Sequence, residues 1–403
     1  MTSKLPDLGL LLFVAAVVAI LTRRLRMPYT AGLVLAGIGL HFLPGRPDVQ
    51  LSKDLIFSVF LPPLVFEAAL YIPWRELRTD LPVVGLLATV GVLLAAAITA
   101  AGMHYAVGWD WSGAIIFGIL ISATDPVSVI ASFKEAGVHG RLRLLVEAES
   151  LLNDGTAAVA FVVALSLAAG ASSKSVVIGG EFLRTFGGGI LCGLAVGGAL
   201  IAFAARTDDR LVEITFTALA AYGSFFLAEH WHLSGVLATL TAGLMTGSYS
   251  SSSSVWASGR ESVESFWDYV AFVANSLIFL LIGARMAQQP FGGVWVPALA
   301  AILLVTLGRA AAIYPVCAIF IRSRLKVSLK HQHVLVWGGL RGALALALAL
   351  GLPSEVPHHD DIVTVSFAVV AFSIFAQGLT MRPLIRRLGE LEEVGADAAD
   401  VRR

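Results

Sequence analysis

The feature that most constrains this chain is a series of apolar runs that recurs from one end of the sequence to the other. Each run is roughly 17–25 residues long, the length at which an α-helix crosses the hydrocarbon core of a bilayer. The 403 residues are 57% hydrophobic and only 14% charged, so a soluble core could not bury the apolar surface. The sequence therefore predicts an all-α polytopic membrane protein.

Loop residues divide the chain into about thirteen predicted membrane spans. The first run is interpreted as a retained helix, because its basic cluster follows the apolar residues instead of preceding them. The predicted spans are 8–22, 28–43, 54–71, 81–106, 111–134, 141–169, 177–205, 212–230, 233–249, 262–287, 293–321, 331–352 and 362–384.

The basic residues alternate between successive loops. Residues such as Arg23 and Arg141 fall on one set of loops, whereas the opposite set holds few, chiefly Arg46, Lys53 and Lys174. Because positive charge marks the cytoplasmic side, we expect a multi-pass protein of the cell (inner) membrane with its N-terminus outside and its C-terminus inside. A net charge of zero gives no argument for nucleic acid as a partner.

Two predicted spans are interrupted at matching positions. The fifth carries Asp125-Pro126, and the twelfth, 334-VLVWGGLRGALALALAL-350, carries three glycines around Arg341. Such paired interruptions point to the binding site of a transporter built from two repeats. We therefore predict one transporter domain with repeats at 8–169 and 212–384, a linker helix at 177–205, and a cytoplasmic tail at 385–403. The segment 248–260 is expected to be a flexible polar linker.

Charged side chains at membrane depth are few, and each costs ~2.5–3.5 kcal/mol or more, so they usually mark a pathway or an internal pair. They are Glu67, Asp125, Glu147, Glu149, Asp154, Arg309 and Arg341, and Asn153 and Asn275 are their neutral polar companions.

The interruption at Asp125-Pro126 predicts oxygen ligands inside the membrane. Proline removes a backbone N–H and frees a carbonyl near Ile121 or Ser122, and Thr124 adds a hydroxyl and a carbonyl at the break. Freed carbonyls are tolerated at this depth only beside a cavity or water, and hard cations prefer oxygen ligands. The alternative is a plain proline kink in which Asp125 caps the restarted helix.

The next span presents a second polar face. Ser150, Asn153 and Asp154 are spaced i, i+3 and i+4, so they share one side of a helix. Gly155 beside Asp154 predicts close approach of a crossing backbone. Burial and a neighbouring carboxylate, here Asp125, both favour protonation, so this site could hold either a cation or a proton. The alternative is a polar face that only supports helix packing.

Each intramembrane arginine stays protonated and needs an anion or freed carbonyls. Glu149 is the natural partner of Arg309, and Arg341 could neutralise the half-helix ends at the second interruption, although the two assignments could be exchanged. Glu67 could join the ion path or be a protonated glutamate in a helix contact.

Taken together, 124-TDP-126, 149-ESLLNDGTA-157 and 338-GGLRGALA-345 resemble the monovalent cation:proton antiporter family, CPA1 branch, of the NhaP and sodium/proton-exchanger type. The resemblance covers essentially the whole chain. It implies two inverted six-helix repeats whose interrupted helices, spans five and twelve, cross near the ion site. It also implies a dimerisation domain beside a mobile core domain, and hence a homodimer in the lipid membrane.

The resemblance also implies residue roles. Asp154 would carry sodium and proton alternately, and sodium would be held by Asp154, Asp125, Ser150 and the Thr124 carbonyl, with Glu67 contributing in some members. Asn153 in place of a second aspartate is associated with electroneutral exchange. Glu149 would pair with an arginine, most plausibly Arg309.

We therefore expect a secondary sodium (or lithium)/proton antiporter that serves sodium transport and pH homeostasis, is not an enzyme and needs no cofactor. A potassium/proton antiporter of the same fold is the nearest alternative. A passive cation channel is disfavoured because no repeated carbonyl filter sequence is present, and an intramembrane hydrolase lacks a partner signature for peptide cleavage.

Overall fold

The computed structural model describes residues 4–25, 27–43, 51–125, 129–130, 133, 138, 140–170, 175–207, 209–252 and 260–388, and within them it contains helices and no strand. The α-helices are α1 (Lys4–Leu25), α2 (Tyr29–His41), α3 (Lys53–Leu55), α4 (Leu61–Leu70), α5 (Trp74–Leu86), α6 (Val92–Gly102), α7 (Trp111–Leu120), α9 (Arg141–Ala168), α10 (Ser175–Ala204), α11 (Arg210–His230), α12 (Gly235–Ser252), α13 (Arg260–Met286), α14 (Trp295–Ile319), α15 (Leu329–Trp337), α16 (Ala343–Leu350), α17 (His359–Phe372) and α18 (Gly378–Leu388). Between them lie the π-helical turns η1 (Ile56–Phe60), η2 (Leu87–Gly91), η3 (Met103–Val107) and η6 (Ser373–Gln377), and the 3₁₀ turn η5 (Phe291–Gly293).

The helices confirm the predicted fold class. A helix is the form in which a single segment satisfies its own backbone polar groups inside a bilayer. Among the described residues, eight helical stretches are long and apolar enough to span a membrane, and α2 and α7 are shorter apolar helices. The eight are Asp7–Leu25, Trp74–Val107, Arg141–Ala168, Gly179–Ala204, Arg210–His230, Arg260–Met286, Trp295–Ile319 and His359–Leu388.

Several helix ends differ from the predicted spans, because helical hydrogen bonds do not require apolar side chains. The helix predicted to begin at 81 begins at Trp74, seven polar-rich residues earlier. The expected linker 248–260 is wrong in its first part, since α12 continues to Ser252, and 253–259 lie outside the described residues. Of the predicted tail, 385–388 belong to α18, and 389–403 lie outside the described residues.

A proline pair explains the wide turn before α4. Pro63 cannot donate the hydrogen bond that the carbonyl of Val59, four residues back, would otherwise receive. That carbonyl accepts instead from the hydroxyl of Tyr222 on α11, at 3.0 Å. The loss within one helix is thus compensated by a contact between two helices.

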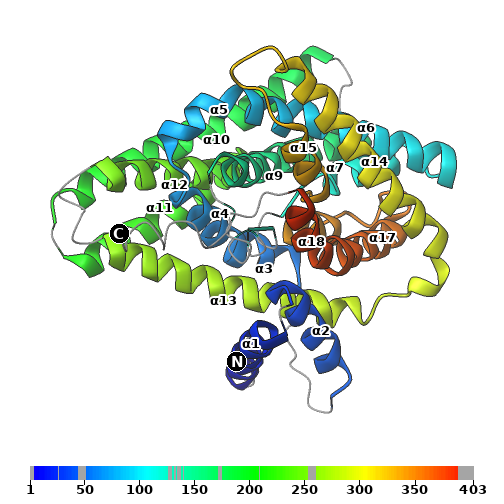
Figure 1. Cartoon of the computed structure of the whole chain (residues 1–403), viewed down its shortest axis with the longest axis horizontal. Helices are drawn as coiled ribbons and strands as arrows, with labels where there is room; N and C mark the ends of the chain where they lie inside the picture. Colours follow the sequence, from blue (N-terminus) through cyan, green and yellow to red (C-terminus); the bar gives the residue numbers. More distant parts are fainter. Residues whose placement is uncertain are drawn as a thin grey trace, which may run out of the picture.

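Close helix packing in one part of the bundle depends on glycine. A Cβ at Gly37 of α2 would collide with the backbone of Leu280 on α13, and a Cβ at Gly283 of α13 would collide with the backbone of Val34. Small residues of this kind let two membrane helices approach until their backbones touch. Figure 1 shows α13 along one edge of the bundle with α2 beside it and α1 beyond.

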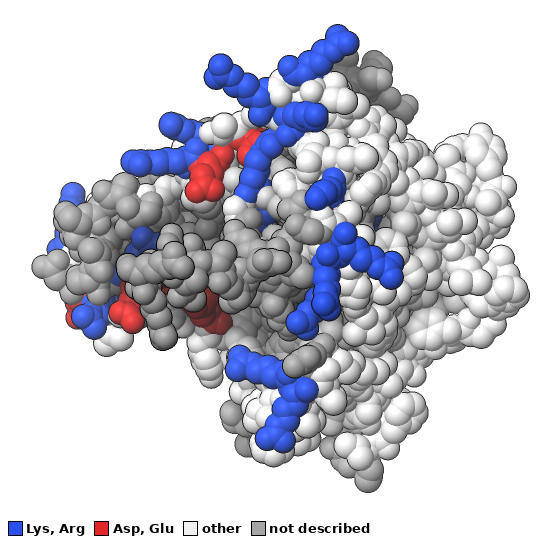
Figure 2. Space-filling view, in the orientation of Figure 1, with Lys and Arg blue, Asp and Glu red and all other residues white. Residues whose placement is uncertain are grey.

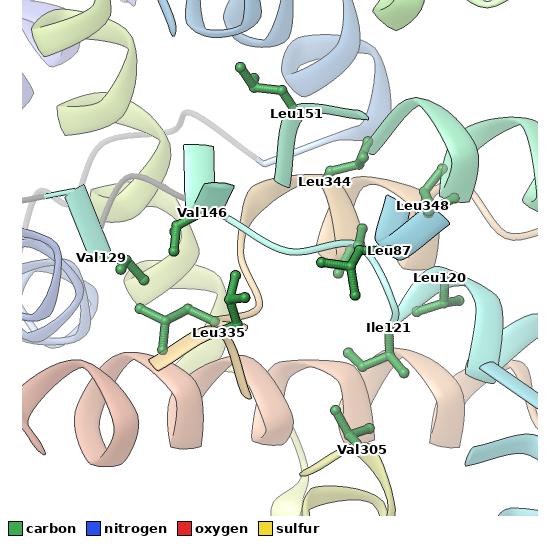
Figure 3. Packing of buried hydrophobic residues seen from close by; sticks show 14 of the residues in the cluster. Leu87, Leu120, Ile121, Val129, Val146, Leu151, Val305, Leu335, Leu344 and Leu348 are labelled. Atoms are coloured by element: carbon green, nitrogen blue, oxygen red, sulfur yellow. The ribbon is translucent and has the colours of Figure 1, made fainter. Parts of the chain in front are cut away.

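The helix α9 lies near the centre of the bundle, with α10 and α12 on one side and α14 and α17 on the other (Figure 1). Leu120 and Ile121 at the end of α7, Leu335 in α15 and Leu344 in α16 belong to one buried apolar cluster (Figure 3). The two interrupted helices are therefore anchored in the core of the protein.

Charge is distributed unevenly over the surface. Figure 2 shows lysine and arginine side chains over the left and middle of the molecule, whereas its right part is almost uncharged.

The division into two repeats with a linker helix stays a prediction.

Candidate functional site

The two predicted interruptions meet. The helix α7 ends at Leu120, and α15 and α16 are separated by the non-helical residues 338–342. The backbone N–H of Asp125 donates to the carbonyl of Leu340 at 2.8 Å, which joins the two breaks directly. Pro126, the predicted cause of the first break, lies outside the described residues.

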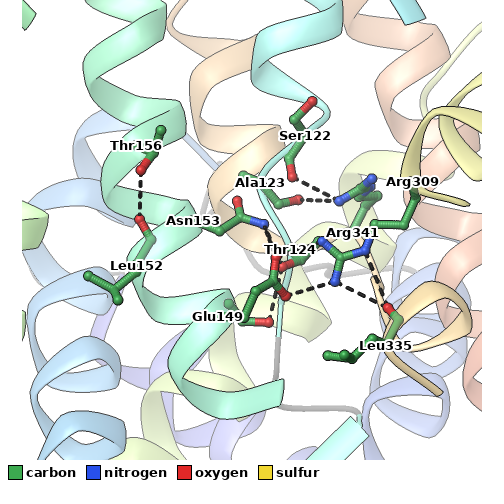
Figure 4. A network of polar contacts seen from close by, with 11 residues as sticks. Ser122, Ala123, Thr124, Glu149, Leu152, Asn153, Thr156, Arg309, Leu335 and Arg341 are labelled. Carbon is green, nitrogen blue, oxygen red and sulfur yellow. Dashed lines mark hydrogen bonds and ion pairs between the residues drawn. The ribbon is translucent and has the colours of Figure 1, made fainter. Parts of the chain in front are cut away.

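Arg341 lies on the second break and holds the carbonyls of the first. Its Nη1 donates to the Ser122 carbonyl at 2.9 Å and to the Ala123 carbonyl at 3.3 Å (Figure 4). These carbonyls follow Leu120, the last residue of α7. The Arg341 side chain is buried, and its charge lies opposite the negative end of the α7 dipole.

The hydroxyl of Thr124 connects the first break to α9. It lies 3.0 Å from the Ser150 hydroxyl and accepts from Nδ2 of Asn153 at 2.9 Å. Nδ2 of Asn153 also donates to Glu149 at 3.3 Å (Figure 4). All four residues are at most 1% exposed, so this buried network fixes the register of the break against α9.

Arg309 of α14 and Glu149 of α9 form a bidentate ion pair. The two N–H···O distances, from Nη1 to Oε1 and from Nη2 to Oε2, are both 2.7 Å, and the side chains are 8% and 2% exposed. Arg309 also donates to the Leu335 carbonyl of α15, at 3.2 and 3.3 Å. The guanidinium group therefore links α9, α14 and α15, which suits its planar fork of donors.

A cavity of about 510 Å³, called here the polar cavity, lies beside the crossed breaks. Asp154, Asp125, Thr124 and Glu67 all line it, so the structure brings together four of the six predicted ion-site residues. The other two, Ser150 and Asn153, do not line this cavity. From α9 they form hydrogen bonds with the Thr124 hydroxyl. Glu67 comes from α4.

Three buried acceptor oxygens near this cavity lack a hydrogen-bond donor among the described residues: Oδ1 of Asn153, of Asp154 and of Asn275. An unsatisfied buried polar atom costs about 1–3 kcal/mol. Oxygen acceptors without donors are the ligands that a hard monovalent cation, or a proton on the carboxylate, would satisfy. The residues present therefore fit a cation or proton site.

Asn275, expected only as a neutral polar residue within its span, also lines the polar cavity, together with two residues that had no predicted role, Asp268 and Tyr71. Asp268 accepts from the Tyr71 hydroxyl at 2.9 Å. Asp268 and Asn275 are seven residues apart, so they lie on one face of α13. That spacing from Asn275 within the predicted span 262–287 was the sequence signal that could have identified Asp268.

One expectation about this site is wrong. Gly155, beside Asp154, was expected to admit a crossing backbone. A Cβ there would instead meet the side chain of Leu237 on α12. Glycine at position 155 leaves room for this apolar side chain to pack against α9. The backbones that cross are those of residues 122–125 and 338–342.

Comparison with known proteins identifies the family of this chain. The family model described as sodium/hydrogen exchanger, transmembrane, matches residues 10–387. The antiporter ApNhaP of Aphanothece halophytica, a Na(+)/H(+) antiporter, is 39% identical over 368 residues, which cover 90% of this chain and 70% of the relative. The Na(+)/H(+) antiporter NhaH of Halobacillus dabanensis is 34% identical over 396 residues, covering 94% and 96% of the two chains.

A solved structure agrees in fold. The sodium proton antiporter MjNhaP1 from Methanocaldococcus jannaschii, determined at pH 8, superimposes with a TM-score of 0.77 at 20% identity, over 96% of this chain and 98% of the other. The extent of the family match and the identity to these relatives establish that the chain belongs to the transmembrane sodium/hydrogen exchanger family.

Proposed function

We propose that this protein exchanges sodium or lithium for protons, and that the cation and the proton compete for Asp154. The relatives named above are Na(+)/H(+) antiporters, which supports the class of transport. The observation that carries the site assignment is the polar cavity, where Asp154 and Asp125 share one space and Oδ1 of Asp154 has no donor among the described residues.

In the proposed cycle the ionised Asp154 carboxylate binds the dehydrated cation together with Asp125 and the oxygens of Thr124. Ser150 and Asn153 act through Thr124, because they bond to its hydroxyl. When a proton binds Asp154 instead, the cation is released and the carrier returns protonated. An unneutralised carboxylate is costly to move through an apolar gate, so only a site occupied by a cation or a proton crosses.

Competition for a single carboxylate implies electroneutral exchange. One sodium ion or one proton adds the same charge to Asp154, so the site moves with the same net charge in both directions. Two further buried charges beside the breaks, Glu149 and Arg309, form an ion pair and contribute no net charge.

The polar cavity reaches the side of the protein where basic residues gather. Arg23 at the end of α1 and Arg143 at the start of α9 line it, together with Glu147, which accepts from Arg143 at 2.6 Å. Under the positive-inside rule this side is cytoplasmic, so we propose an inward-open state in the cell (inner) membrane, with the N-terminus outside. We also propose a homodimer, as the family resemblance implies.

Reconstitution with a pH-sensitive dye inside the liposomes tests this function. We expect proton movement on addition of sodium or lithium, at a rate that a potassium ionophore and an imposed membrane potential leave unchanged. The Asp154→Asn variant should show none. Exchange driven by potassium alone would establish the potassium/proton alternative. Sodium uptake without proton movement would indicate a channel. Undiminished exchange by Asp154→Asn would refute the role of Asp154.

A further inference from the structure

A second, larger cavity lies on the other side of α9. It has a volume of about 920 Å³ and is lined by residues of α5, α9, α10 and α12. Its lining is almost entirely apolar. The hydroxyls of Thr241 and Ser248 on this wall donate to carbonyls four residues back, at 2.7 and 2.6 Å, so they too present little polar surface. We call this space the apolar cavity.

The apolar cavity has the dimensions of a lipid tail. It follows α10 from Ile190 to Ile201 and α12 from Leu237 to Tyr249, which at 1.5 Å per residue are lengths of about 17 and 18 Å. A Cβ at Gly197 of α10 would touch Ala242 of α12, so the two helices pack closely along this length. Each length is close to the depth of one leaflet in a hydrocarbon core ~30 Å thick.

The apolar cavity is open to the outer surface of the bundle. Among its lining residues, Leu81 is 39% exposed, and Trp74 and Leu194 are each 43% exposed. In a bilayer these exposed faces meet lipid. Water is disfavoured in an apolar space of this kind, so an acyl chain is the ligand that both the lining and the surroundings favour.

One end of the apolar cavity is suited to a headgroup. Trp74 at the start of α5 and Tyr249 near the end of α12 are aromatic residues of the kind found at the bilayer interface. Arg75 and Arg78, in the first two turns of α5, are exposed. Arginines close to the membrane surface attract anionic lipids, with about a fivefold gain in affinity for each basic residue.

The apolar cavity also bears on the proposed ion site. Leu151 of α9 lines both cavities, and Ala148 and Leu152 line the apolar one. Leu151 is three residues from Asp154, is only 3% exposed and belongs to the buried apolar cluster, at the margin of the residues drawn in Figure 3. A chain in the apolar cavity would support the wall of α9 that separates the ion site from the membrane.

We propose that the apolar cavity binds one acyl chain of an anionic phospholipid, whose headgroup lies beside Arg75 and Arg78, and that this lipid supports α9 during transport. The lipid comes from the leaflet on the basic side of the protein.

The test uses the full chain and a phosphatidylglycerol that carries a photoactivatable diazirine on one acyl chain. We expect crosslinks to map to α9, α10 and α12 within the cavity. Gly198→Leu should abolish them, because this glycine lines the cavity and its added Cβ would only touch Met245, at 3.5 Å. Gly187→Leu on the same helix is the matched control, since no atom lies within 4 Å of its Cβ and it does not line the cavity.

The headgroup is tested separately. The double variant Arg75→Gln/Arg78→Gln should weaken phosphatidylglycerol crosslinking by more than tenfold, whereas Arg184→Gln, an exposed arginine within α10, should leave it unchanged. Equal crosslinking of phosphatidylcholine and phosphatidylglycerol would overturn the anionic headgroup. Crosslinking that persists in Gly198→Leu, or that detergent added before irradiation abolishes completely, would overturn the site. Binding is measured without transport, so this result is independent of the proposed exchange.

The role in transport is measured in liposomes. Exchange by the wild type and by Gly187→Leu should increase when phosphatidylglycerol is added to phosphatidylcholine, and exchange by Gly198→Leu should not respond. An equal response of all three proteins would overturn the support of α9 by this lipid.

Discussion

The backbone N–H of Asp125 donates to the carbonyl of Leu340 at 2.8 Å, across 215 positions of sequence. The bond joins the end of one interrupted helix to the break in another. The side chain of Arg341, the next residue after Leu340, donates two hydrogen bonds to the carbonyls of Ser122 and Ala123. The two breaks therefore form one unit, in which a backbone N–H of the first break donates to a backbone carbonyl of the second and the Arg341 side chain satisfies two carbonyls of the first. The carboxylate of Asp125 is positioned by that unit.

Gly342 makes this crossing possible, and its replacement should impair the site. A Cβ at position 342 would overlap the Asp125 carboxylate. Gly342→Ala should therefore displace Asp125 and lower sodium-driven exchange by about tenfold or more, a loss that corresponds to ~1.4 kcal/mol. Exchange in liposomes and thermal unfolding in detergent should be measured together. Gly85→Ala on α5 is the control, because no atom lies within 4 Å of its Cβ. Full activity of Gly342→Ala would contradict the crossing described here.

The Arg309–Glu149 ion pair should stabilise the folded protein. Both side chains are buried, so Arg309→Met leaves an uncompensated carboxylate, and we expect the free energy of unfolding to fall by about 3–5 kcal/mol. Adding Glu149→Gln should restore most of the loss, because removal of both charges abolishes the unpaired ion. Thermal unfolding in detergent measures both variants. If the double variant is no more stable than the single one, the pair is not the cause.

Much of the architecture could be predicted because the bilayer imposes a length on each span and makes every intramembrane charge conspicuous. The break before Pro126 and the glycines around Arg341 were visible as exceptions within apolar runs. Helix ends were less predictable. The first turns of α5 are polar, yet they remain helical, and Asp80 there forms an ion pair with Arg141 at 2.7 Å.

The pairing of the polar residues at the site could not be predicted, because it depends on contacts between segments that are distant in sequence. The sequence could not decide whether Arg309 or Arg341 faces Glu149, because that depends on how α14 packs against α9. Nor could it show that Ser150 and Asn153 face the Thr124 hydroxyl while Asp154, on the same helical face, reaches the polar cavity. Asp268 was missed because it lies near a span end, where a charged residue is unremarkable by itself.

Ser150 should affect cation affinity more than stability. Its hydroxyl contacts Thr124 and does not line the polar cavity. Ser150→Ala removes one hydrogen-bond partner of Thr124, a change of about 1 kcal/mol, so the KM for sodium should rise about fivefold. The maximal rate should change little. Initial rates of exchange over a range of sodium concentrations measure both parameters. A fall in maximal rate with an unchanged KM would contradict positioning through Thr124.

Competition at Asp154 predicts both the pH dependence and a proton count. A proton and a sodium ion cannot occupy the carboxylate together, so the apparent sodium affinity should fall as pH falls, by about tenfold per pH unit once the protonated form predominates. Sodium added to the purified protein under those conditions should release about one proton, as calorimetry in buffers of different ionisation enthalpy would measure. Asp154→Asn should release none, whereas Asp360→Asn, a fully exposed carboxylate at the start of α17, should behave as wild type. Proton release that persists in Asp154→Asn would assign the exchange to another carboxylate of the polar cavity, with Asp125 and Glu67 the next to replace.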